Sequence, residues 1–167
     1  MNAKTVDETQ IVMAQQMMPH DANPYGNVHG GVIVKLIDTT GGVVALRHAG
    51  RNVVTASIDR LDFLQPAFVG DILILKASLN LVGSSSMEVG CRVEAENPIT
   101  GQVRHAASAY LTYVALDADG RPTAVPPLTL QGPEQTRRNA QAAQRRGLRL
   151  AERRNEAAMD RAGRPGQ

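Results

Sequence analysis

Five residues whose types suit chemistry on a carbonyl group stand within sixteen positions near the N-terminus: Asn23, His29, Gly30, Gly31 and Asp38. Apolar residues at helical spacing follow the glycines, which predicts that the glycines stand at a helix N-terminus. There the first N–H groups lack partners inside the helix, and the helix dipole is positive. Such a position suits a carbonyl oxygen that becomes negative during a reaction. A carboxylate two turns further on, among apolar neighbours, adds a second reactive group.

Each of these features has an ordinary structural explanation. Paired glycines before a helix are common in loops, and an aspartate in a helix usually faces solvent. A lone histidine is more often a hydrogen-bonded structural residue than a catalyst. The close grouping of all five favours a functional site over these separate explanations.

Length and composition indicate one ordinary globular domain. The chain has 167 residues, of which 43% are hydrophobic and 20% are charged. It has no apolar run of roughly 18 residues and no signal-peptide pattern at its start, so we expect a cytoplasmic protein without a membrane partner. Cys91 stands in an alternating strand pattern and is predicted to be a small core residue. The Cys and His spacing favours neither a disulfide nor a metal site.

The basic charge is concentrated in the tail. Residues 134–167 contain nine arginines and four acids, which leaves a net charge of −3 on residues 1–133. Small apolar residues recur in the tail at three- and four-residue intervals, which predicts a helix with a thin apolar stripe that fades before Gly163. We favour a solvated, partly frayed helix over nucleic-acid binding, because the tail contains no aromatic residue. A third possible use of the arginines is to bind a phosphate-bearing ligand.

The rest of the chain alternates between apolar and polar residues, as half-buried strands do. Strands are predicted at residues 10–18, 53–62, 71–82, 87–96 and 103–116. One long helix and one antiparallel sheet predict an α+β fold of two layers, with the helix across the concave face. Gly41 and Gly42 inside the helix favour close contact with the sheet. The other face or edge is expected to be buried in an oligomer, with a two-fold dimer as the default.

These motifs resemble those of a known family. The run Asn-x-x-Gly-Asn-Val-His-Gly-Gly-Val-x-x-Lys-Leu-Ile-Asp at residues 23–38 is similar to that of the hotdog-fold acyl-CoA thioesterases, in the cytosolic acyl-CoA hydrolase group with its bacterial single-domain relatives. Further similar segments, including residues 52–57, 85–89 and 112–116, follow in order over residues 8–150. The resemblance implies a hotdog fold, with an antiparallel sheet wrapped around one long central helix and an extra C-terminal helix. It divides the chain into an N-terminal extension (1–9), a hotdog domain (10–130) and a basic helix with a frayed tail (131–167).

The resemblance also implies an activity, the hydrolysis of acyl-CoA to free fatty acid and coenzyme A at a dimer interface. Asp38 matches the position of the carboxylate that acts as general base or nucleophile, and Asn23 that of the residue orienting water or substrate. The Gly30 and Gly31 amides match the group that polarises the thioester carbonyl. His29 takes a supporting role. A symmetric dimer would then carry two sites, each built from both subunits.

Coenzyme A contacts are expected at less specific positions. The pantetheine arm is expected near Phe63, Pro66, Ser84, Ser85 and Ser86, and the phosphates near Arg47, Arg51 or Arg104. Considered by itself, each of these arginines is more readily explained as a surface charge. Asp59 and Asp62, on an alternating strand, are interpreted as part of a polar face rather than as a catalytic pair.

The resemblance further implies a trimer of dimers with acyl-CoA as the ligand, and coenzyme A as part of the substrate rather than a cofactor. Two alternatives stay open at this stage. A hotdog hydratase or dehydratase would need a differently placed histidine. A module that only binds acyl-CoA would use the same fold, although the presence of both Asp38 and Asn23 argues against it.

Overall fold

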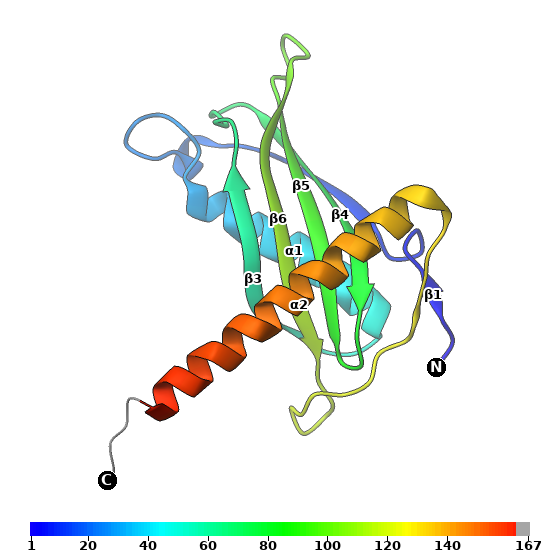
Figure 1. The fold of residues 1–167 in the computed structure, drawn as a ribbon. Helices are drawn as coiled ribbons and strands as arrows, with labels where there is room; N and C mark the ends of the chain where they lie inside the picture. The colour runs from blue at the N-terminus through cyan, green and yellow to red at the C-terminus, as the bar shows by residue number, and fades with distance from the viewer. Residues whose placement is uncertain (163–167) are drawn as a thin grey trace.

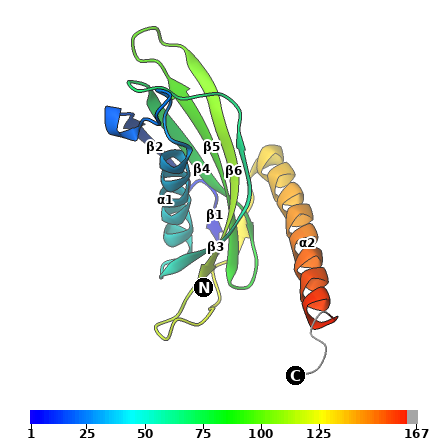
Figure 2. The same ribbon diagram turned by 90° about the vertical axis from the view of Figure 1, so that its left-hand side faces the viewer.

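The structure, a computed structural model, describes residues 1–162 and is built on one five-stranded antiparallel sheet. The strands are β2 (Ile11–Gln16), β3 (Val53–Phe63), β4 (Ile72–Val82), β5 (Ser86–Glu96) and β6 (Val103–Ala115). Their spatial order is β2-β4-β5-β6-β3, so β2 and β3 are the edges. The long helix α1 (Gly30–Ala49) crosses one face of the sheet, and α2 (Gly132–Ala162) lies on the other (Figures 1 and 2). The predicted α+β class, with a sheet around one central helix and an extra C-terminal helix, is confirmed.

The main core lies between α1 and the sheet. The alternation of β4, β5 and β6 points Leu75, Val89 and Leu111 inward, where each is fully buried against Ile37 and its neighbours on α1. Cys91 shares this inner face and is buried, as predicted, and burial raises the pKa of its thiol to about 12. Because successive side chains alternate, the outer face of the same strands carries mostly polar and charged residues.

The glycine pair inside α1 permits a close approach of the sheet at one of its two positions. A Cβ on Gly41 would lie 2.5 Å from the Tyr113 hydroxyl of β6, whereas a Cβ on Gly42 would meet only Tyr113 Cε1, at 3.8 Å. Tyr113 is almost fully buried. The prediction of close contact with the sheet is therefore confirmed for Gly41, and Gly42 has room for a methyl group.

The expectation of two layers with a solvated C-terminal helix is wrong for the first half of α2. Ala142 is fully buried against the sheet, and Asn139 Nδ2 donates to the Asn80 carbonyl at 2.8 Å. Arg145 pairs with the buried Glu88 at 2.6 Å. The helix is thus attached mainly through polar groups on the outer face, which an apolar stripe does not reveal. Residues 150–159 are all exposed, as expected of a solvated end, and the expected fading at Gly163 lies outside the described residues.

Short segments complete the fold at the two ends of α1. Near its start stands a 3₁₀ turn, η1 (Pro19–Asp21). Near its C-terminal end, β1 (Lys4–Thr5) pairs in parallel with β7 (Leu128–Thr129), so the N-terminal extension is hydrogen-bonded to the segment before α2. Within residues 1–162 no helix is both long enough and apolar enough to span a membrane.

Candidate active site

The loop that precedes α1 is held in shape by Asn23. Its side-chain oxygen accepts from the backbone N–H groups of Tyr25 (2.9 Å) and Asn27 (3.2 Å), and its backbone N–H donates to the Asn27 carbonyl (2.7 Å). Such an Asx turn is typical of asparagine, and Gly26 supplies the positive φ of 86° that closes it. Asn23 therefore shapes the loop through its oxygen, while its Nδ2 group is left as the atom that could face a ligand.

His29 caps the start of α1. Its Nδ1 atom accepts from the Gly31 amide at 2.9 Å, which makes His29 the N-cap residue. The Gly31 amide, predicted to polarise a carbonyl, is thus occupied in this structure. Among the described residues no acceptor is found for the Gly30 amide, which leaves it as the better placed of the two. The supporting role expected of His29 takes a concrete form here, because the imidazole fixes the geometry of the first helical turn.

Asp38 lies half-buried on α1, facing the edge strand β3 and its neighbour β6. Thr55 Oγ1 of β3 donates to Asp38 Oδ1 at 2.6 Å. The Tyr113 hydroxyl of β6 donates to the Asp38 backbone carbonyl at 2.9 Å and lies 3.4 Å from Oδ1. Burial, with the Asp38 carboxylate beside it, raises the pKa of Tyr113, so the phenol stays protonated and donates. Within residues 1–162 both bonds to the carboxylate itself are made at Oδ1, so Oδ2 is left to accept from another group.

Thr55 and Tyr113 were not identified from the sequence. Nothing in the strand that contains Thr55 distinguishes it from the other polar residues of that strand, because its partner lies 17 positions away on another element. For Tyr113, one feature of the sequence could have pointed to such a residue. The glycine at position 41, one turn after Asp38, indicated that a bulky group approaches the helix at that level.

The helix start and Asp38 are too far apart to act on one carbonyl within a single protomer. Eight residues separate Gly30 from Asp38, and an α-helix rises 1.5 Å per residue, which places them about 12 Å apart along the axis. A carbonyl carbon and its oxygen are only about 1.2 Å apart. The two halves of the predicted site can therefore meet only if one comes from another copy of the chain.

The residues predicted to contact pantetheine fall at opposite ends of the protomer. Phe63 ends β3 beside the start of α1, where its ring lies 3.4 Å from the position a Gly30 Cβ would take. Its side chain is half exposed, and Pro66 follows in the exposed loop. The turn of Ser84, Ser85 and Ser86 joins β4 to β5 at the other end, where the Ser84 and Ser85 carbonyls accept from Val125 and Ala115.

The three arginines predicted to contact phosphates are all bonded within the protomer. Arg47 donates to the Gln10 and Glu8 carbonyls, and Arg51 to Thr123, at the C-terminal end of α1. Arg104 pairs with the buried Asp71, and its guanidinium lies 5.2 Å from the centre of the Phe68 ring. These bonds agree with a structural use of each arginine, and contact with phosphates stays a prediction.

Asp59 and Asp62 face away from Asp38. Asp59 accepts from Ser57 and Thr112 and pairs with Arg149 of α2, on the outer face of the sheet. Asp62 pairs with Arg60. Their interpretation as a polar face agrees with these contacts. Among residues 1–162 no group of three potential metal ligands is found.

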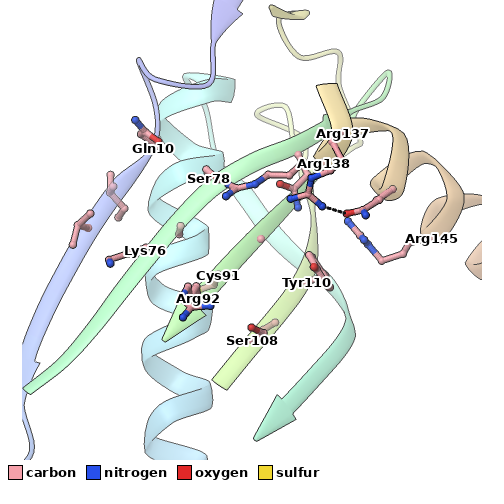
Figure 3. Close-up of a pocket in the computed structure, with 17 residues that line it drawn as sticks. Gln10, Lys76, Ser78, Cys91, Arg92, Ser108, Tyr110, Arg137, Arg138 and Arg145 are labelled. Carbon is pink, nitrogen blue, oxygen red and sulfur yellow. Dashed lines mark hydrogen bonds between the residues drawn. The ribbon is translucent and has the colours of Figure 1, made fainter. Parts of the chain in front are cut away.

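A cavity of about 530 Å³ also lies on that outer face, between the sheet and α2 (Figure 3). Gly90 and Tyr110 belong to its lining, and neither Asp38 nor any residue of the α1 start does. The sheet separates it from Asp38, so within one protomer this cavity is not part of the predicted site.

One antiparallel sheet packed around one long helix is the architecture of the hotdog fold, and comparison with known proteins agrees. Residues 25–102 match the thioesterase superfamily. The uncharacterized acyl-CoA thioester hydrolase YkhA of Bacillus subtilis is 36% identical over 152 residues, which cover 91% of this chain and 88% of that protein. The human cytosolic acyl coenzyme A thioester hydrolase is 35% identical over 136 residues, which cover 80% of this chain and 36% of the human protein. The chain belongs to the thioesterase superfamily.

Solved structures extend the likeness to almost the whole chain. A hexameric acyl-CoA thioesterase in its apo form superposes with a TM-score of 0.88 and 34% identity, covering 91% of this chain and 97% of that one. The acyl-CoA hydrolase of Staphylococcus aureus, solved with butyryl coenzyme A, coenzyme A and coenzyme A disulfide, gives a TM-score of 0.87 and 33% identity, covering 97% and 99%.

Proposed function

We propose that the protein hydrolyses acyl-CoA thioesters to a free fatty acid and coenzyme A. This proposal rests on the position of Asp38 in a chain of the thioesterase superfamily. Thr55 holds its Oδ1, and its Oδ2 is left for a reacting group. In the reaction a water oxygen bonds to the carbonyl carbon, the carbon–sulfur bond breaks, and the thiolate leaves. Its relatives named as acyl-CoA hydrolases support this substrate class.

Asp38 can act in either of two ways. As a general base its Oδ2 takes a proton from water while the water oxygen attacks. As a nucleophile it bonds to the acyl carbon and forms an anhydride, which water then opens. In both cases a helix N-terminal amide, here best Gly30, stabilises the negative oxygen of the tetrahedral intermediate.

A two-fold dimer through β3 supplies the missing half of the site. This edge strand presents eleven residues with one side unpaired, and Val54 and Ile58 on it are exposed apolar residues. Antiparallel pairing of β3 with its own copy, centred near Asp59, sets the Phe63 end of one strand beside the Thr55 end of the other. Since Phe63 contacts the start of α1 and Thr55 contacts Asp38, that pairing brings Gly30 of one subunit toward Asp38 of the other.

Variants of the Staphylococcus aureus hydrolase support the choice of residues. Solved forms of that protein carry an alanine in place of one asparagine, one aspartate and one threonine, at positions spaced 15 and 17 residues apart. Asn23, Asp38 and Thr55 of this chain have the same types and the same spacing. The sites studied in that relative therefore agree with the cluster found here, including Thr55.

The same relatives support an assembly and a location for the protein. Several similar structures are described as hexameric, which favours the trimer of dimers that the family resemblance implies. Mammalian relatives are named as cytosolic, which favours a cytoplasmic location. Light scattering coupled to gel filtration distinguishes a hexamer from a dimer or tetramer.

Thiol release from acyl-CoA substrates of short, medium and long chains tests the activity directly. We expect hydrolysis by the wild-type protein and a loss of at least about 100-fold in kcat for Asp38→Ala, because the reacting carboxylate is removed. Asp62→Ala removes a carboxylate from the neighbouring strand and is the matched control. Binding of coenzyme A without thiol release would favour the acyl-CoA-binding module, and an active Asp38→Ala enzyme would exclude Asp38 as the reacting group.

Mixing two inactive variants tests whether sites are shared between subunits. In a dimer of one Asp38→Ala and one Asn23→Ala subunit, a shared site can combine the intact Asp38 of one subunit with the intact Asn23 of the other. Random association then restores about a quarter of wild-type activity, since half the dimers are mixed and each has one complete site. Sites contained within one chain would restore none.

A further inference from the structure

The cavity on the outer face of the sheet has a floor made of two cross-strand rows (Figure 3). In sheet register these rows are Ser78, Gly90 and Tyr110, and next to them Lys76, Arg92 and Ser108. Gly90, at the centre of the first row, lies between Ser78 on β4 and Tyr110 on β6. The first half of α2 forms the opposite wall. The result is a hollow of about 530 Å³, a size typical of sites for small molecules.

The lining of this cavity is positively charged and includes no acidic residue. Its five cationic residues come from two sides, β4 and β5 on one and α2 on the other: Lys76, Arg92, Arg137, Arg138 and Arg145. Hydroxyl groups of Ser78, Ser108 and Tyr110 lie between them. Three of the five cations belong to the basic residues 134–167, and the sheet contributes Lys76 and Arg92.

On the sheet side two cations share one carboxylate. Lys76 Nζ lies 2.7 Å from Glu94 and Arg92 Nε lies 2.8 Å from it, and both bonds lower the pKa of Glu94. One carboxylate neutralises one positive charge, so this trio keeps a charge of +1. Both cations are about half exposed at the cavity and can reach a ligand.

The α2 side repeats the arrangement. Arg137 and Arg138 both bond to Glu134, at 2.7 and 2.9 Å, and these bonds lower the pKa of Glu134 to about 2. This trio also keeps a charge of +1. Arg145 differs, because its charge is balanced by the buried Glu88 and its guanidinium lies 3.7 Å from the centre of the Tyr110 ring. Two uncompensated positive charges therefore face each other across a hollow lined with hydroxyl donors.

We propose that this cavity binds the phosphate groups of a small molecule of about nucleotide size. Guanidinium groups and hydroxyls match the geometry of phosphate oxygens, and a charge of +2 matches a phosphate monoester or diphosphate. The hollow is partly open, and its volume suits a small molecule rather than a nucleic-acid strand. The phosphates can belong to a free metabolite or to the nucleotide end of a coenzyme A held by another subunit.

Calorimetric titration of the whole protein with inorganic pyrophosphate, adenosine diphosphate and coenzyme A tests the proposal. The variant Lys76→Gln/Arg138→Gln removes one cation from each trio and leaves each carboxylate with a partner. The control Arg153→Gln/Arg154→Gln makes the same change of net charge on the exposed end of α2, away from the cavity. Urea unfolding verifies that both variants are folded. Because only binding is measured, the result does not depend on whether the protein hydrolyses acyl-CoA.

We expect wild-type protein to bind pyrophosphate and adenosine diphosphate, and the cavity variant to bind them at least about tenfold more weakly, since two charge-assisted contacts are lost. The control should bind as wild type does. If saturating coenzyme A leaves adenosine diphosphate bound, the ligand is a free metabolite. If coenzyme A displaces it and is itself bound more weakly by the cavity variant, the phosphates are those of coenzyme A. Absence of binding at millimolar concentration, or equal weakening in both variants, overturns the proposal.

Discussion

Replacing Gly41 by alanine tests whether Tyr113 holds Asp38 in position. The added Cβ would lie 2.5 Å from the Tyr113 hydroxyl and 3.2 Å from two carbons of its ring, so the ring must move away from α1 by close to 1 Å. Tyr113 is almost fully buried and cannot turn into solvent. The shift breaks the 2.9 Å bond from its hydroxyl to the Asp38 carbonyl and the weaker contact with Oδ1.

This displacement should lower both the free energy of unfolding and kcat. Overpacking a core costs about 1–3 kcal/mol, and an alanine in place of glycine in a helix returns about 1 kcal/mol, so the net loss is about 0–2 kcal/mol. Losing a hydrogen bond worth about 0.5–1.5 kcal/mol corresponds to a fall in kcat of about 2- to 10-fold. These magnitudes are within reach of urea unfolding and of a thiol-release assay.

Gly42→Ala is the matched control, because its Cβ meets Tyr113 only at an ordinary contact distance. It should raise stability by up to about 1 kcal/mol and leave kcat unchanged. Tyr113→Phe in the Gly41→Ala background removes the clashing oxygen, so it should restore stability and leave kcat low. If both alanine variants have the same kcat, or if the double variant regains wild-type kcat, Tyr113 does not position Asp38.

Three further expectations concern other parts of the molecule. His48 is fully buried, its Nε2 bonds the Pro126 carbonyl, and burial lowers its pKa, so in mild acid the unfolded chain binds a proton that the folded chain does not. The free energy of unfolding should therefore fall as the pH drops from 7.5 to 5.5. The His48→Gln variant should show a smaller slope. Thr55→Ala should lower kcat about 10-fold and Thr55→Ser should keep most of it, since only the serine retains the donor to Asp38. Arg145→Ala leaves the buried Glu88 without its cationic partner. The free energy of unfolding in urea should fall by about 2–4 kcal/mol, and amide exchange in α2 should become faster. Adding Glu88→Gln should recover part of the lost stability.

The sheet and the central helix could be predicted from sequence because each depends on a local pattern. Alternation with period two placed β4 and β5 within a residue or two, and the apolar spacing after Gly30 placed α1. These patterns record which residues face the core, and the burial of those residues is the main driving force of folding. A core position such as Cys91 follows from the same alternation.

The attachment of α2 could not be predicted in the same way. Its contacts with the sheet are ion pairs and hydrogen bonds, such as those of Arg145 with Glu88 and Asn139 with Asn80, between residues about 60 positions apart. A polar residue that is to be buried against a polar partner looks in sequence like one that faces water. The thin apolar stripe of the tail therefore indicated a solvated helix, although Ala142 within it is fully buried.

The proposed division of the site between subunits, by contrast, is inferred from the spacing of the first motif. Gly30 and Asp38 are eight residues apart on one helix, so about 12 Å of rigid backbone separates the amide that would stabilise the oxygen from the carboxylate that would attack the carbon. No side-chain rotation closes that gap, because the amide belongs to the backbone. A second copy, related by a two-fold axis beside β3, reverses the direction of α1 and brings the opposite ends together. The position of Asp38 next to an edge strand agrees with this proposal, because a carboxylate beside an edge strand can meet the helix start of another subunit.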